Sequence, residues 1–241
     1  MNSKMSQRLF PSVSPDLKYF EAGFSLPELM VAMTITIMMA GLASALLAGS
    51  FSIRTRENQK TEALADTQRG LNLMTREISN SGYALIDNGI VAADSGASSI
   101  RVRANLNAAS GEVTSNATSD RDEDVKYFLY SDSNNSYIVR LDVNSSAQEM
   151  VLANRVDALN LRYYADKVTY TSGTCDIADV RDSFGNPVTE VAQKGGAKYI
   201  VMTVCVNLPA VSTPGAPGYQ PASKVQLTSD IALRNSDLFN Y

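Results

Sequence analysis

The order of hydrophobic and polar positions divides this chain of 241 residues into three consecutive patterns. The first is a run of 25 positions, residues 29–53, that contains no charged residue. A helix of roughly 20 apolar residues crosses the hydrocarbon core of a bilayer, so this run is long enough to span one. It therefore predicts a membrane-spanning helix near the N-terminus.

The second pattern keeps the helical period but is rich in charge, and it covers residues 54–82. Its apolar stripe is too short, at about two heptads, to favour a coiled-coil seam over packing against the chain's own head. Both alternatives stay open at this point, and Gly82 is expected to cap the helix. The positions of the stripe are Leu64, Thr67, Leu71, Met74 and Ile78.

The third pattern begins near residue 98, where short segments rich in Val, Ile, Tyr and Leu alternate with polar turn clusters. About 150 residues in such segments suffice for one compact core. We therefore predict an α+β fold, in which a long N-terminal helix is transmembrane in its first half, amphipathic in its second, and packed on an antiparallel β-sheet head. The expected strands are residues 99–106, 125–130, 137–143, 158–164, 199–207 and 224–233.

Composition excludes several kinds of chemistry. The 21 basic and 25 acidic residues give a net charge of −4, which provides no electrostatic footprint for nucleic acid. The chain has no histidine, which removes Ser-His-Asp and Cys-His nucleophile arrangements and His-ligated zinc. We expect neither an enzyme nor a cofactor.

An acidic run at residues 120–124 has the composition of a calcium loop. Val125 stands where such a loop needs a turn glycine, and Ser131 stands where it needs the terminal glutamate. The run is therefore expected to be a solvated turn ahead of a strand, and no metal site is predicted.

The residues just before the uncharged run include a carboxylate, that of Glu28, whose position needs an explanation. Ser25 and Glu28 are three apart and read as a capping box, with Pro27 tolerated in the first turn. Yet an unpaired charge deep in a bilayer costs about 2.5–3.5 kcal/mol, so an acid at the edge of a span indicates a missing cationic partner.

Residues 23–35, GFSLPELMVAMTI, resemble the class III signal of type IV prepilins. The resemblance implies that a prepilin peptidase cuts after Gly23 and that the new N-terminal Phe24 is N-methylated. It also implies that Glu28 attracts the N-terminal ammonium of a neighbouring subunit.

The same resemblance implies a division of the chain into four parts. Residues 1–23 are the leader peptide, residues 24–53 the transmembrane and filament-core helix, residues 54–82 its amphipathic continuation, and residues 83–241 a periplasmic head. The basic residues of the leader favour keeping it in the cytoplasm. The implied location is the inner membrane, with a single pass, and afterwards the pilus at the cell surface.

Three later stretches, residues 74–83, 156–166 and 230–235, are similar to parts of PilW-type minor pilins. This resemblance implies a minor pilin that primes or caps type IV pilus assembly. Its partners would be the inner membrane, the prepilin peptidase, the other minor pilins and the major pilin, with a tip adhesin as a further candidate.

Two alternative functions stay open. The C-terminal stretch also resembles J-type pseudopilins of type II secretion. A tip adhesion or DNA-capture module is the other alternative, for which the loop at residues 212–221 and the tyrosine-containing strands are the candidate surfaces, although both have ordinary structural interpretations.

Cys175 and Cys205 are the only two cysteines, and both lie in the predicted head. An even pair beyond an export signal is a disulfide candidate. The alternative is a free, buried Cys205 with an exposed Cys175. A bridge would stabilise the head by about 3–4 kcal/mol if the geometry allows it.

Overall fold

The computed structural model describes residues 23–107, 118–133, 135–145 and 148–236. The chain divides into two compact units, Met1–Leu46 and Leu47–Tyr241. Apart from Gly23, the leader expected at residues 1–23 lies outside the described residues.

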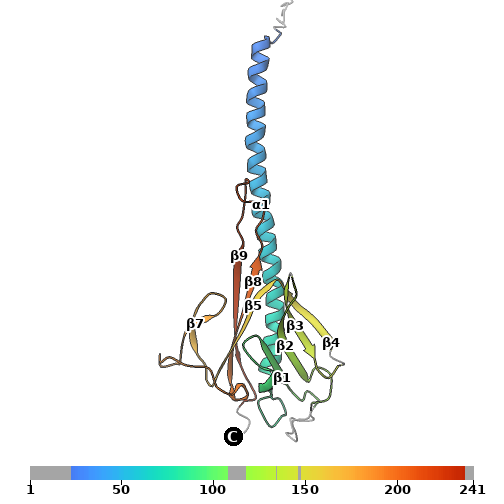
Figure 1. Cartoon of the computed structure of the whole chain (residues 1–241), viewed down its shortest axis with the longest axis vertical. Helices are drawn as coiled ribbons and strands as arrows, with labels where there is room; N and C mark the ends of the chain where they lie inside the picture. The colour runs from blue at the N-terminus through green and yellow to red at the C-terminus, as the bar shows by residue number, and fades with distance from the viewer. Residues whose placement is uncertain (1–22, 108–117, 134, 146–147, 237–241) are drawn as a thin grey trace, which may run out of the picture. The chain divides into compact units, whose positions relative to one another are not determined.

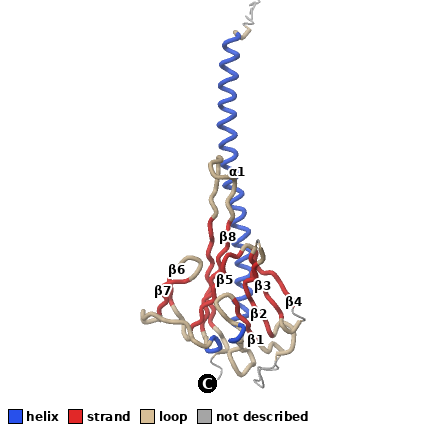
Figure 2. Tube along the Cα trace, in the orientation of Figure 1, coloured by secondary structure: helices blue, strands red, loops and turns tan. Residues whose placement is uncertain are grey.

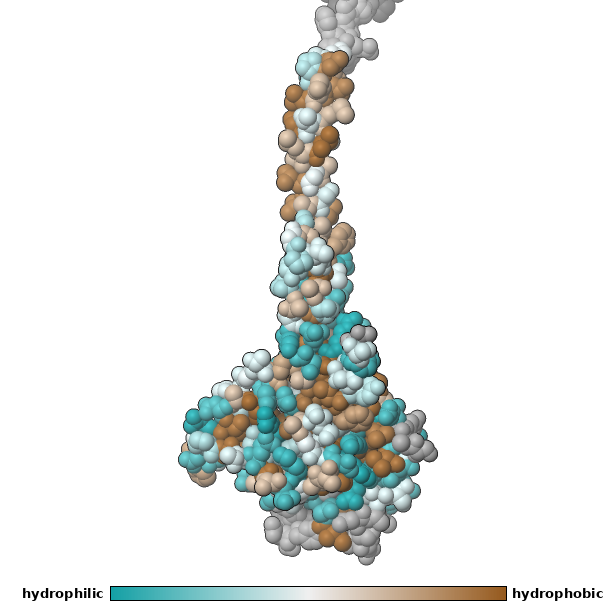
Figure 3. Space-filling view, viewed as in Figure 1, coloured by the Kyte–Doolittle hydropathy of each residue, from teal (hydrophilic) through white to brown (hydrophobic). Residues whose placement is uncertain are grey.

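Helix α1 comprises Leu26–Ser79, 54 residues that include both the uncharged run and most of the charged continuation (Figure 1). It is the one described helix whose length and composition suffice to cross a membrane. Figure 3 shows apolar side chains gathered along its N-terminal part, where every described residue as far as Ala48 is exposed.

The helix ends three residues before Gly82. Gly82 is left-handed, with φ of +79°, but its N–H donates to the carbonyl of Arg103 at 2.9 Å instead of closing the helix. A Cβ at this position would lie 2.8 Å from the backbone of Asn88. The glycine is therefore required by the turn that follows the helix, not by the helix end itself.

The described strands form two antiparallel sheets and a separate hairpin (Figure 2). The first sheet has the order β1-β2-β3-β4, the second has the order β5-β8-β9, and β6 pairs with β7. Among the described residues, two 3₁₀ turns, Ala92–Asp94 and Lys194–Gly196, lie in the connections. The strands are β1 Ser99–Arg103, β2 Asp124–Ser131, β3 Ser136–Asp142, β4 Gln148–Asn154, β5 Val156–Tyr164, β6 Thr169–Ser172, β7 Ile177–Arg181, β8 Tyr199–Leu208 and β9 Ser223–Ala232.

All six expected strands are present, and the α+β layout with antiparallel sheets is confirmed. Strand β1 ends at Arg103, before the expected end, and β4, β6 and β7 were not predicted. The two hairpin strands are short and most of their residues are exposed, so they carry no clear alternation of apolar and polar positions.

One core joins the helix to both sheets. Leu71, Met74 and Ile78 of α1 are buried in the same cluster as Tyr127 of the first sheet and Ile200 of the second. The apolar stripe of the helix is thus covered by the chain's own head, which decides between the two alternatives in favour of self-packing.

Candidate functional site

The N-terminal candidate residues lie together at the start of α1. Gly23, Phe24 and Ser25 precede the helix, and Phe24 is 83% exposed. Glu28 lies in the first helical turn and is also exposed. The segment is accessible, as a processing enzyme or a second subunit would require.

The contact between Ser25 and Glu28 differs from the expected capping box. Ser25 holds the N-cap position and its carbonyl accepts the N–H of Leu29 at 3.1 Å. Its hydroxyl donates to the Glu28 carboxylate at 3.5 Å, a contact between side chains instead of the paired side-chain-to-backbone bonds of a capping box. Glu28 is exposed, and Ser25 is the one donor to its carboxylate among the described residues.

Three hydroxyl groups within the uncharged run are satisfied by the helix itself. Thr34 donates to the carbonyl of Val31 at 2.8 Å, Thr36 to that of Ala32 at 2.7 Å, and Ser44 to that of Ala40 at 2.8 Å. Polar groups in hydrocarbon need internal partners, so these residues are compatible with a lipid environment.

The connection between β8 and β9, residues 209–222, lies against α1 (Figure 1). The guanidinium of Arg56 donates to the carbonyl of Pro209 at 2.6 Å and to that of Pro221 at 2.8 Å, and it also bonds the hydroxyl of Ser223. This loop contains the stretch that the sequence offered as an adhesive surface, and the structure packs part of it on the helix.

The disulfide between Cys175 and Cys205 is confirmed, with the Cα atoms 5.2 Å apart. Cys205 is buried on β8, and Cys175 lies between β6 and β7, so the bridge ties the hairpin to the second sheet. Asp157 lies close to both sulfur atoms. Because the sulfurs are bonded to each other and Lys224 pairs with Asp157, this group offers no thiolate ligand for a metal.

The acidic run at residues 120–124 is less solvated than expected. Glu123 and Asp124 are 3% and 5% exposed. The Glu123 carboxylate accepts backbone N–H groups from Leu106 at 2.9 Å, Asp120 at 3.1 Å and Ser119 at 3.2 Å. The expectation of a solvated turn was therefore wrong for these two residues, because neighbouring backbone and a distant arginine satisfy their carboxylates.

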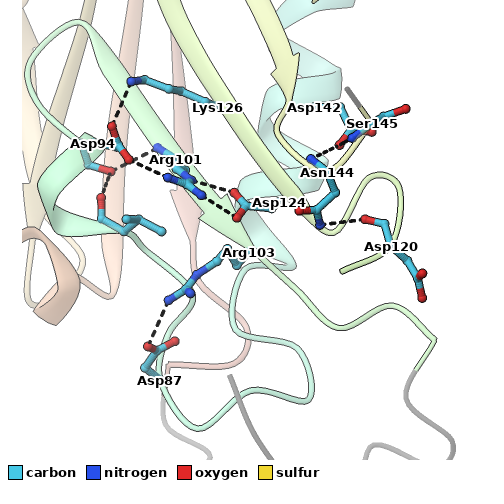
Figure 4. A network of polar contacts seen from close by, with 12 residues as sticks. Asp87, Asp94, Arg101, Arg103, Asp120, Asp124, Lys126, Asp142, Asn144 and Ser145 are labelled. Atoms are coloured by element: carbon cyan, nitrogen blue, oxygen red, sulfur yellow. Dashed lines mark hydrogen bonds and ion pairs between the residues drawn. The ribbon is translucent and has the colours of Figure 1, made fainter. Parts of the chain in front are cut away.

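That arginine is Arg101, which connects two carboxylates (Figure 4). It donates to both oxygens of Asp124 at 2.7 Å and to Asp94 at 2.7 Å, and Lys126 reaches Asp94 at 3.0 Å. The hydrogen bonds from Arg101 and then Lys126 hold the pKa of Asp94 below its ordinary value. The network joins the 3₁₀ turn before β1 to the edge strand β1 and to its neighbour β2.

A second network connects the helix to the first sheet. Arg140 of β3, a residue 6% exposed, donates to Glu77 of α1 at 3.0 and 3.2 Å and to Asp122 at 2.7 Å. The Tyr127 hydroxyl donates to the same Glu77 carboxylate. Burial, and then the charge of Glu77, raise the pKa of Tyr127, so the phenol stays protonated.

Glu77, Asp122 and Arg140 border a cavity of about 410 Å³ between α1 and the first sheet. Its apolar walls include Leu73, Val102 and Met150, and two of its several charged residues, Glu77 and Arg140, are paired with each other. This pair holds α1 against the first sheet. Sequence reasoning missed the pair because 63 positions separate its members.

A third network lies on the second sheet. Arg162 of β5 pairs with Asp176 and, at 2.7 Å, with Glu190, and Lys194 reaches Glu190 at 2.9 Å. Burial alone would raise the pKa of Glu190, but the hydrogen bonds from Arg162 and Lys194 outweigh it and lower that pKa.

No protein-family model, curated protein or solved structure matches this chain.

The arrangement as a whole offers an accessible N-terminal segment, an exposed apolar helix and a head held by ion pairs and a disulfide. Among the described residues, the sequence-predicted Gly23, Phe24 and Glu28 lie together, whereas Cys175 and Cys205 belong to the separate task of stabilising the head.

Proposed function

We propose that this chain is a structural subunit of a type IV pilus, a minor pilin of the PilW type that primes or caps filament assembly. The observation that carries the proposal is the order Gly23, Phe24 and Glu28 directly ahead of a long uncharged helix, with all three residues exposed. In this proposal a prepilin peptidase removes residues 1–23 and the mature chain begins at Phe24.

In this proposal, Glu28 recognises the N-terminus of a neighbouring subunit. Cleavage creates an α-amino group, whose ordinary pKa of about 7.7–8.0 leaves it largely charged at neutral pH. The exposed Glu28 carboxylate binds that ammonium on a neighbouring subunit, and each charge thereby gains a partner at the edge of an apolar environment.

The uncharged helix supplies the assembly step. Its apolar side chains are exposed among the described residues, so lipid or other helices must cover them. Small residues along it, among them Gly41, Ala45 and Ala48, allow other pilin helices to approach closely. A cluster of minor pilins that covers these side chains in advance lowers the cost of extracting the first subunits from the membrane.

The head serves as a rigid contact surface for the other minor pilins and for a tip adhesin, and it has no catalytic role in this proposal. Three arginine-centred networks and one disulfide support this view, since they fix elements of the head relative to one another, and the Arg140 network also ties the first sheet to α1. A J-type pseudopilin of type II secretion remains the alternative, because the same helix and head suit a short periplasmic filament.

The test is deletion of the gene in a strain that also lacks the pilus retraction motor, with surface filaments counted and exoprotein secretion measured. Loss of filaments with normal secretion is the expected result. Normal filaments with blocked secretion would assign the chain to the pseudopilin alternative. Normal filaments together with normal secretion would refute both.

Complementation separates the role of Glu28 from that of the helix. Glu28→Ala is expected to be processed at Gly23 but to restore few filaments. Glu57→Ala, which removes an exposed acid farther along α1, is the matched control and is expected to restore them. Equal restoration by both variants would contradict the proposed pairing with a neighbouring ammonium.

A further inference from the structure

The β8–β9 loop, residues 209–222, meets α1 at the first position where the helix is covered. Every described residue from 23 to 48 is exposed, and Gly49 is the first that is partly buried. The backbones are in close contact there, since a Cβ on Gly218 would lie 2.6 Å from the Cα of Gly49 and 3.0 Å from the Ser52 side chain. Only glycine at position 218 permits this approach.

The loop is held in place at its base. Two carbonyls near its ends, those of Pro209 and Pro221, accept hydrogen bonds from Arg56. Inside it, Val211 and Gln220 form an antiparallel bridge with two backbone hydrogen bonds of 3.0 Å. The tip, residues 212–219, is thus a defined part of the head.

The composition of the loop differs from that of the rest of the head. Its 14 residues include no charged side chain, four prolines and Tyr219. Residues 212–215 and Pro217 are exposed at its tip. Prolines present no N–H to be desolvated, and tyrosine is enriched where a bilayer meets water.

The number of helix residues that the loop leaves uncovered indicates where the bilayer surface lies relative to the tip. The uncharged run begins at Leu29, and the part of it that the loop leaves uncovered is residues 29–48, which is 20 positions. Roughly 20 helical residues cross a hydrocarbon core of about 30 Å. One boundary of the bilayer therefore falls at Gly49, the residue that Gly218 touches, and the exposed Arg54 follows within reach of lipid phosphates.

We infer that the tip of the β8–β9 loop rests in the headgroup region of the bilayer beside α1 for as long as the subunit is in the membrane. This inference rests on the membrane-spanning role of α1 in the proposed function. The loop then acts as a collar that sets how deeply the helix is inserted and keeps Arg56 outside the hydrocarbon.

The experiment uses the full chain in phosphatidylcholine nanodiscs whose acyl chains are brominated close to the glycerol backbone. The natural chain has no tryptophan, so each variant carries one fluorescent reporter. Thr213→Trp reports on the exposed tip, and Tyr219→Trp is a conservative second reporter in the same loop. Leu42→Trp reports on the helix span.

Phe184→Trp is the matched control in the head. Phe184 is 88% exposed and follows β7, whose hairpin packs against Tyr199 at the other end of β8. Ten strand residues at about 3.3 Å each place that end roughly 30 Å from the loop. Its emission is expected to be the same in brominated and ordinary lipid.

The expected result is loss of most emission from Leu42→Trp and from both loop reporters in brominated lipid, with Phe184→Trp unchanged. Quenching of Leu42→Trp without quenching of either loop reporter would overturn the inference and leave the membrane anchor intact; a protein partner would then be the occupant of the tip. Absence of quenching at Leu42→Trp would overturn the anchor itself and the inference with it.

Discussion

The carboxylate of Glu77 on α1 accepts two hydrogen bonds from the guanidinium of Arg140 on β3, at 3.0 and 3.2 Å. The arginine side chain is 7% exposed, so its charge depends on this contact and on Asp122 for compensation. The helix and the first sheet are joined by an ion pair as well as by apolar packing.

Glu77→Ala is therefore expected to lower the free energy of unfolding by about 3 kcal/mol. This value is at the lower end of the cost of removing one partner from a buried ion pair, because Asp122 remains beside Arg140. Urea unfolding of the detergent-solubilised chain, followed by near-ultraviolet circular dichroism, measures the change. Glu62→Ala removes an exposed acid from the same helix and is expected to be nearly neutral. Equal losses in the two variants would contradict the structural role of the pair.

Gly218→Ala is expected to detach the β8–β9 loop from α1. The variant combines a left-handed φ of +80° with the clash against Gly49, and overpacking of this kind costs about 1–3 kcal/mol. Faster proteolytic cleavage within residues 209–222 is the measurement.

Two glycines of the same region are controls for that variant. Gly215→Ala has a φ of +86° but no atom within 4 Å of the new Cβ, so it carries the backbone strain without the clash. Gly49→Ala places its Cβ 4.0 Å from Gly218, an ordinary contact. If Gly215→Ala opened the loop as much as Gly218→Ala, the close approach to the helix would not be what holds it.

Removal of the disulfide with Cys175→Ser and Cys205→Ser together is expected to cost about 3–4 kcal/mol, the value for closure of a loop of this length. The β6–β7 hairpin should lose most of its protection from hydrogen exchange, because the bridge ties it to β8. The natural chain treated with a reductant should match the double variant. A variant as stable as the oxidised chain would show that the hairpin is held by its other contacts.

Acid is expected to destabilise the head through Asp94 and Glu190, whose pKa values are held below their ordinary range by neighbouring cations. A carboxyl group with a lowered folded pKa contributes stability above its unfolded pKa, about 3.9 for Asp and 4.3 for Glu. That contribution is lost as the pH falls through the folded value. Stability should therefore decline from about pH 5 downward.

Denaturant midpoints measured across this range provide the check. Asp94→Asn combined with Glu190→Gln should flatten the decline, whereas Glu62→Gln at an exposed position should leave it unchanged. If the denaturant midpoint of the double variant fell with pH as steeply as that of the natural chain, other carboxylates would be the cause of the acid sensitivity.

Local patterns of apolar residues predicted much of this fold because they reflect which face of a single helix or strand is buried. Leu71, Met74 and Ile78 recur at helical spacing since one face of α1 meets the core, and the six expected strands alternate or run apolar for the same reason. Strands β6 and β7 escaped prediction because most of their residues are exposed and none is fully buried, so few positions had to be apolar.

The residues of the candidate site also differ in whether the sequence alone could predict them. Gly23, Phe24 and Glu28 form a continuous motif, so the sequence alone was enough to propose them. The Glu77–Arg140 pair and the burial of Glu123 were not foreseeable, because a charged residue has the same local pattern whether solvent or a distant partner satisfies it.

By itself, the sequence determined that this protein has an uncharged helix long enough to cross a bilayer, an amphipathic continuation, a β-rich head and one pair of cysteines. Those properties follow from local composition and from the spacing of apolar residues, which can be recognised within a short stretch of sequence. Only the tertiary structure decided where the helix first becomes covered, because Gly49 and Gly218 are 169 positions apart in the sequence. Contacts at such separations depend on how the strands between them pair and pack, and no local pattern encodes that arrangement.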